Sequence, residues 1–351
     1  MPPDSSTLDA LQKRQRKSLR IALAVALGLT IAEIQGEPFT FLAPLLAFQM
    51  LLNSRQTPSL PQALGFVVII AAASGFALGL ANTLQNRPLV YLLVLGLVVF
   101  GCFLMQLTGR GGPLPAMLLT CNVMVPVLAV VSRDLAQHFV WIMIASAGSA
   151  VLLAWLGYAL FPDTPGMISI EAGREPQNQP SATIAPVRTA CAYTLILMPA
   201  LIHYLAVDGE VSIVVLITIV SLLSQKVDIR QRAAFGLLLG NLIGGVLASV
   251  AYYTVAMVPW LPLLFLVTLA VALALSEGAT RPTPEAEIFA VAMPTFLILL
   301  GLGLTPISDG SGGAFISRFI DVGLASLYAL AGVSLLLPRR CILPCQARFR
   351  G

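Results

Sequence analysis

The sequence predicts an all-α polytopic membrane protein of about 12 transmembrane helices, arranged as two parallel six-helix repeats. Three observations favour this fold class. Hydrophobic residues make up 58% of the 351 residues and charged residues only 10%, whereas soluble domains carry about 25% charged residues. The apolar residues lie in stretches long enough to cross a bilayer, which takes roughly 20 residues per helix. The two halves of the chain also show the same order of features.

Twelve apolar segments are candidate spans. They lie near 18–35, 38–53, 60–82, 88–107, 112–131, 135–161, 185–206, 209–225, 231–255, 258–277, 284–305 and 314–338. The second and eighth are short, so each either spans or forms a re-entrant piece beside its neighbour. A basic run precedes the first segment, as in a signal peptide. The length of that segment and the spans after it favour an uncleaved first span.

The positions of Lys and Arg set the orientation, because these residues concentrate in cytoplasmic loops. With the N-terminus inside, all 20 basic residues occupy inner positions except Arg87, Arg133 and Arg318. A wrong number of spans would destroy this asymmetry. The pattern therefore predicts an even number of spans and cytoplasmic N- and C-termini.

The chain divides into five expected regions. They are a basic cytoplasmic tail (1–17), a first membrane repeat (18–162), a cytoplasmic linker (163–184), a second membrane repeat (185–338) and a basic cytoplasmic tail (339–351). The linker is rich in Pro, Gly, Asn and Gln, which predicts flexibility.

The two repeats begin and end alike. Leu19-Arg20 opens the first span of one half and Val187-Arg188 that of the other. Phe161-Pro162 and Leu337-Pro338 close the last spans. Glycine-rich third spans, with Gly75-x-x-x-Gly79 and Gly236-x-x-x-Gly240-x-x-x-Gly244, are interpreted as close helix-packing positions. Six spans per half predict a parallel repeat, which is common in transporters.

No motif in the chain predicts catalysis. There is no Walker loop, and no nucleophile and base can be assembled into a catalytic set. The five cysteines show neither a zinc pattern nor a disulfide spacing. We therefore expect no catalytic residues, no metal, no cofactor, no nucleic-acid partner and no enzymatic activity.

Polar residues at membrane depth are the candidate functional residues, because they are costly in hydrocarbon. Glu33, His203 and Asp321 are candidate proton carriers. Glu33 is otherwise an interfacial carboxylate that reaches water, and His203, the one deep histidine, is otherwise a hydrogen-bonded structural residue. Asp321 shares a helical face with Arg318, as a gated ion pair or as an interfacial salt bridge.

Arginines and amides are the candidate substrate contacts. Arg20, Arg188 and Arg318 are suited to an anion, while Asn122 and Asn241 either line a path or bond across helices. Prolines add a further clue. Pro44, Pro126 and Pro294 interrupt candidate spans, and the two short segments occupy matching places in the halves, which points to a transport site.

The chain resembles the fusaric acid resistance and aromatic acid exporter superfamily. The resemblance rests on R-K-S-L-R-I-A-L-A-V-A (Arg16 to Ala26), on F-T-F-L-A-P-L-L (Phe39 to Leu46), on the basic turn that follows and on the glycine-rich third span. The chain looks like the compact branch of that superfamily, because its linker is too short for a large cytoplasmic domain.

This resemblance implies an inner-membrane exporter of small aromatic carboxylates in bacteria. Such an exporter implies a small organic anion as substrate, the lipid bilayer as surroundings, and a periplasmic membrane-fusion adaptor and a homo-oligomer as further partners. We expect proton-driven efflux. A passive organic-anion channel and a non-transporting membrane scaffold remain the alternatives.

Overall fold

The computed structural model describes residues 5–54, 56–84, 87–109, 114–162, 186–206, 213–224, 231–283, 285–304 and 312–336. These residues form helices and a few of the turns beside them. The helices are α1 (Ser5–Gln35), α2 (Leu42–Asn53), α3 (Leu60–Leu84), α4 (Pro88–Leu107), α5 (Leu114–Val131), α6 (Arg133–Leu160), α8 (Pro186–Ala206), α9 (Ile213–Ser224), α10 (Gln231–Met257), α11 (Leu261–Ala279), α12 (Ala286–Leu304) and α13 (Gly312–Leu336). Each predicted span coincides with one helix to within a few residues, except that α1 begins earlier.

The helices are those of a polytopic membrane protein. Among the described residues, seven are long and apolar enough to cross a bilayer: α1 from Leu11 onward, α3, α4, α6, α10 from Leu239 onward, α11 and α12. The helices α2 and α9 have 12 residues each. At 1.5 Å per residue they are about 18 Å long, shorter than the hydrocarbon core of roughly 30 Å. Over its described residues, neither helix is long enough to cross the membrane on its own.

The two halves of the chain pack in the same way. In the first half, α1, α2 and α6 pack against one another, α3 packs against α4, α5 and α6, and α5 also packs against α4 and α6. In the second half, α8, α9 and α13 pack against one another, α10 packs against α11, α12 and α13, and α12 also packs against α11 and α13. Each pair in one half has its counterpart in the other, as expected for two six-helix repeats.

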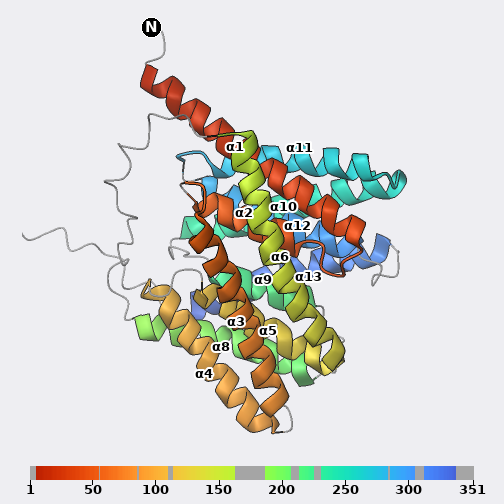
Figure 1. Ribbon diagram of the computed structural model, residues 1–351. Coiled ribbons are helices and arrows are strands. Elements are labelled where there is room, and N and C mark those ends of the chain that lie inside the picture. Colours follow the sequence, from red (N-terminus) through yellow and green to blue (C-terminus); the bar gives the residue numbers. More distant parts are fainter. Residues whose placement is uncertain are drawn as a thin grey trace, which may run out of the picture.

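Two kinds of contact between the halves come in matching pairs as well. The fourth helix of each half packs on the first helix of the other, so α4 lies on α8 and α11 lies on α1. Figure 1 shows α4 and α11 at opposite sides of the molecule. The second helix of each half also packs on the fifth helix of the other, joining α2 to α12 and α9 to α5. This exchange is the pattern of a pseudo-two-fold axis between the halves.

The basic start of α1 holds several helix ends together. Lys17 Nζ donates to Leu52 O in the last turn of α2 at 2.7 Å, and an Arg16 nitrogen donates to Pro162 O just beyond α6 at 3.0 Å. Carbonyls at a helix C-terminus lack intrahelical partners and attract cations. The C-terminal ends of α2 and α6 therefore lie beside the N-terminal part of α1, as alternating spans require.

The glycine-rich third helices differ between the halves. A Cβ on Gly240 would lie 2.6 Å from Ile288 O, and one on Gly244 would overlap Ala292 O, so α10 and α12 touch backbone to backbone. This confirms the packing interpretation for α10. A Cβ on Gly75 or Gly79 would meet nothing within 4 Å. The interpretation was wrong for α3, whose glycines face away from the described helices.

Candidate functional site

The centre of the molecule is formed by α5 and α12. All residues of 121–129 in α5 and of 291–300 in α12 are buried, which marks helices enclosed on every side. Each contains an interior proline, Pro126 or Pro294. Proline lacks an N–H, so the carbonyls of Asn122 and Ala290, four residues earlier, lose their usual helical donors. Such free carbonyls are tolerated where they face protein or a wet cavity.

The two short helices meet these two proline-containing helices across the boundary between the halves. The helix α2 packs on α12, and α9 packs on α5. Short and interrupted helices at the interface of two repeats are the usual setting of a transport site. Pro44 does not contribute an interruption, contrary to the prediction, because it lies in the first turn of α2, where a missing N–H breaks no helical bond.

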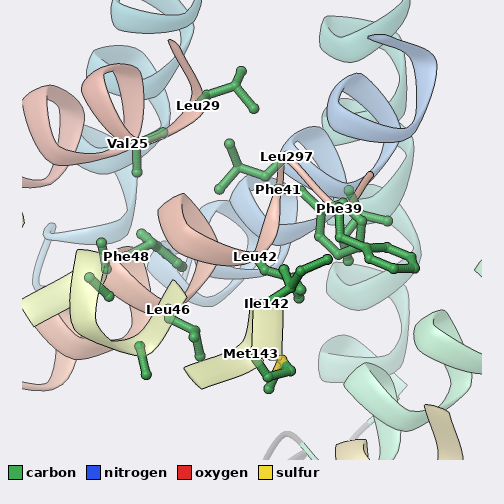
Figure 2. Close-up of a cluster of buried hydrophobic side chains, with 14 of the residues drawn as sticks. Val25, Leu29, Phe39, Phe41, Leu42, Leu46, Phe48, Ile142, Met143 and Leu297 are labelled. Atoms are coloured by element: carbon green, nitrogen blue, oxygen red, sulfur yellow. The ribbon is translucent and has the colours of Figure 1, made fainter. Parts of the chain in front are cut away.

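An irregular segment, buried over residues 39–41, leads from α1 into α2 at this centre. Gly36, with φ of +65°, ends α1, and the segment then packs on α12, where Thr40 Oγ1 donates to Gly301 O at 3.2 Å. Phe39 packs edge-on against Phe139 of α6, with ring centroids 5.3 Å apart. Figure 2 shows Phe39 and Phe41 gathered beside Leu297 of α12. The aromatic side chains thus fix the irregular backbone within the core.

Asn122 is the buried amide that lacks a full set of partners. Its side chain is 1% exposed, and Nδ2 donates to Leu118 O of the same helix at 2.8 Å. The amide oxygen Oδ1 is buried and accepts no hydrogen bond from the described residues. Of the two predicted amides, Asn122 therefore keeps a free acceptor at the centre of the molecule.

Asn241 belongs instead to a closed hydrogen-bond network between three helices. Its Nδ2 donates to Ser326 Oγ of α13 at 2.8 Å, and its Oδ1 accepts from Thr295 Oγ1 of α12 at 2.6 Å. The hydroxyls of Ser326 and Thr295 also donate to carbonyls of their own helices. Both ends of the Asn241 amide have protein partners, so the network ties α10, α12 and α13 together. Sequence reasoning did not find Thr295 or Ser326, because hydroxyl residues are common in apolar helices.

Arg20 is buried at the end of α6. Its Nε donates to Phe161 O at 2.7 Å, and its guanidinium lies 4.1 Å from the centroid of the Tyr158 ring. The cation thus meets a helix C-terminus and an aromatic face, both of which attract positive charge. These contacts stabilise the buried charge of Arg20. Arg188, at the matching position of α8, is exposed.

The predicted pair in the last helix is described only in part. Arg318 lies in α13, but its side chain is outside the described residues, so the ion pair with Asp321 is outside them too. Asp321 is half-buried. Its carboxylate takes part in no hydrogen bond or ion pair among the parts of the chain that the structure describes.

The predicted proton carriers are not brought together by any described contact. Glu33 is half-buried near the end of α1, whereas His203 is exposed on α8. Residues 207–212 of the second acidic turn lie outside the described residues. The structure instead brings Glu37 near His138, a pair that the sequence analysis did not propose. Burial raises the pKa of Glu37, and the electrostatic attraction of His138 lowers it in part.

No described group of three or more His, Cys, Asp and Glu side chains could hold a metal ion. The cysteines that the structure describes, Cys102, Cys121 and Cys191, are all free. The site therefore consists of buried amides, hydroxyls and freed backbone carbonyls between proline-containing and short helices.

These features define a duplicated polytopic helical membrane protein. Residues 195–332 match the family described as "Fusaric acid resistance protein-like", and residues 17–156 match the family described as "Protein of unknown function (DUF2955)". The match over 195–332 confirms the resemblance to that superfamily seen in the sequence. No curated protein and no solved structure matches the chain.

Proposed function

We propose that this protein is a secondary efflux transporter of the bacterial inner membrane for small organic anions such as aromatic carboxylates. The observation that carries the proposal is the arrangement at the pseudo-two-fold axis. There, each half places its short second helix against the proline-containing fifth helix of the other half. The family match supports membrane transport.

The proposed orientation places both termini in the cytoplasm. The basic start of α1 lies beside the C-terminal ends of α2 and α6, so these ends share one side of the membrane with the N-terminus. Two repeats over 18–162 and 185–338, joined by a cytoplasmic linker over 163–184, complete the proposed organisation. A periplasmic adaptor and a homo-oligomer are further proposed partners.

The proposed transport cycle moves the two halves relative to each other around α5 and α12. Buried groups such as Asn122 become accessible to substrate only through such a movement, because no described side chain of 121–129 is exposed. The proton gradient is the proposed driving force. Glu33 and Asp321, both half-buried, remain the proposed proton carriers together with His203.

The deciding experiment compares the killing of cells with and without the protein by small aromatic and aliphatic acids. We expect protection against one class of acid, and we expect a protonophore to abolish it. Protection that survives the protonophore contradicts proton coupling. Voltage-driven current in liposomes that ignores an imposed pH gradient identifies a channel instead. No transport by protein purified in liposomes, with or without adaptor, supports the scaffold alternative.

The coupling residues have their own test. A Glu33→Gln, Asp321→Asn double variant should lose protection while it still reaches the membrane. Glu285→Gln is the matched control, because Glu285 is an exposed carboxylate just before α12. Full protection by the double variant would rule out these two carboxylates as carriers.

A further inference from the structure

Two buried polar side chains on neighbouring helices each have one atom without a hydrogen-bond partner among the described residues. Asn122 of α5 and Ser146 of α6 are each 1% exposed, and neither Asn122 Oδ1 nor Ser146 Oγ has a partner among the described residues. An unsatisfied buried polar group costs about 1–3 kcal/mol, and hydrocarbon around the protein offers no water to relieve it. A partner that is not part of the chain would remove this cost.

The two groups lie at the same level of one helical hairpin. The helices α5 and α6 pack together and are joined by Ser132 alone. The Asn122 amide reaches back to Leu118 O at 2.8 Å. Leu118 and Ser146 are equally far along the chain from Ser132, and antiparallel helices rise equally per residue. The amide of Asn122 and the hydroxyl of Ser146 are therefore at the same depth in the membrane.

The chemistry of this pair is that of a hydrogen-bond acceptor. The bond to Leu118 O fixes the orientation of the Asn122 amide, because a flipped amide would place two oxygens against each other. The free atom is therefore Oδ1. Pro126 also removes the N–H that would otherwise bind the Asn122 carbonyl. Two packed helices thus offer, at one depth, two acceptor oxygens of Asn122 and the hydroxyl of Ser146, which both donates and accepts.

We propose that Asn122 and Ser146 form a subsite that binds a neutral hydrogen-bond donor of the transported compound, such as a hydroxyl or an amino substituent. An ionised carboxylate offers only acceptors, so the acid group of the substrate binds elsewhere. The inference rests on the proposed transport function and specifies its substrate. A site built to accept a hydrogen bond discriminates strongly against an analogue that lacks the donor.

The test measures export of 3-hydroxybenzoate and 3-methylbenzoate by the full chain in liposomes near neutral pH. The two acids differ only in a hydroxyl or a methyl at one position. We expect the wild-type protein to prefer the hydroxyl compound, and we expect Asn122→Leu and Ser146→Ala to lower that preference about tenfold, the value of one hydrogen bond. Ser74→Ala is the matched control, since Ser74 is buried on α3 but donates to Ile70 O.

Thermal unfolding separates this subsite from a structural role. Removing an unsatisfied acceptor should leave Asn122→Leu as stable as the wild type or more so. Equal slowing of both acids by Asn122→Leu would overturn the subsite and leave the proposed function standing, as would a clear loss of stability. If the wild-type protein in liposomes transports neither of these acids nor any other acid tested, both the proposed function and the subsite are overturned.

Discussion

Arg20 and Arg188 make the sharpest test of how the two repeats differ. Replacement of Arg20 by Met removes the bond from Nε to Phe161 O and the contact with the Tyr158 ring. A charged hydrogen bond contributes about 1.5–3 kcal/mol, and a desolvated cation–π contact contributes about 2 kcal/mol. These terms overlap, so we expect Arg20→Met to destabilise the protein by about 3–4 kcal/mol.

The assay is thermal unfolding of the purified protein in detergent, followed by tryptophan fluorescence. Arg188→Met is the matched control, because Arg188 occupies the same position of the other repeat but is exposed. Its midpoint should move by no more than about a degree, since exposed substitutions have small effects. Equal shifts for both variants, or none for Arg20→Met, would refute the reasoning that α1 and α6 are held together by this buried cation.

Three further predictions follow from the same structure. Gly244→Ala should lower the free energy of unfolding by about 1–3 kcal/mol, because the added methyl overlaps α12. Gly75→Ala should be neutral or stabilising by up to about 1 kcal/mol, because nothing lies near its Cβ. Equal thermal unfolding midpoints for the two variants would contradict this difference. Asn241→Leu should cost about 1–3 kcal/mol because two buried hydroxyls lose a partner, and an unchanged midpoint would show the network to be dispensable. Burial raises the pKa of Glu37 above its usual 4.5, although the attraction of His138 opposes this rise. The folded state therefore holds the proton more tightly than the unfolded state. The free energy of unfolding falls as pH rises from the unfolded-state pKa to the folded-state pKa. Glu37→Gln should reduce the pH dependence of the unfolding midpoint in this range. A slope identical to that of the wild type would contradict the raised pKa of Glu37.

Much of the architecture is local and was therefore predictable. A stretch of about 20 apolar residues bounded by charges, Gly or Pro specifies a membrane helix by itself, which is why the predicted span 88–107 coincides with α4 (Pro88–Leu107). The even number of segments and their duplication followed from the order of basic turns and glycine-rich spans. The contacts of the two halves repeat that order.

The candidate site was predictable only in its residue types. Asn122 and Asn241 both stood out as amides in apolar helices, but one has a free acceptor and the other lies in a closed network. The hydroxyl of Ser146 gave no signal in a helix rich in small residues. Whether a buried polar group has a partner depends on the helix opposite, and that helix is distant in the sequence.

The sequence by itself determined where the helices of the described residues lie and which ends carry positive charge. Only the tertiary structure decided which side of each helix is buried. Arg20 and Arg188 open their repeats alike, yet one is enclosed and the other exposed, and Gly75 and Gly244 share a motif, yet only one touches a neighbouring backbone. The physical reason is that lipid is as apolar as a protein interior. Hydrophobicity along the chain therefore identifies a membrane helix without showing which of its faces meets another helix.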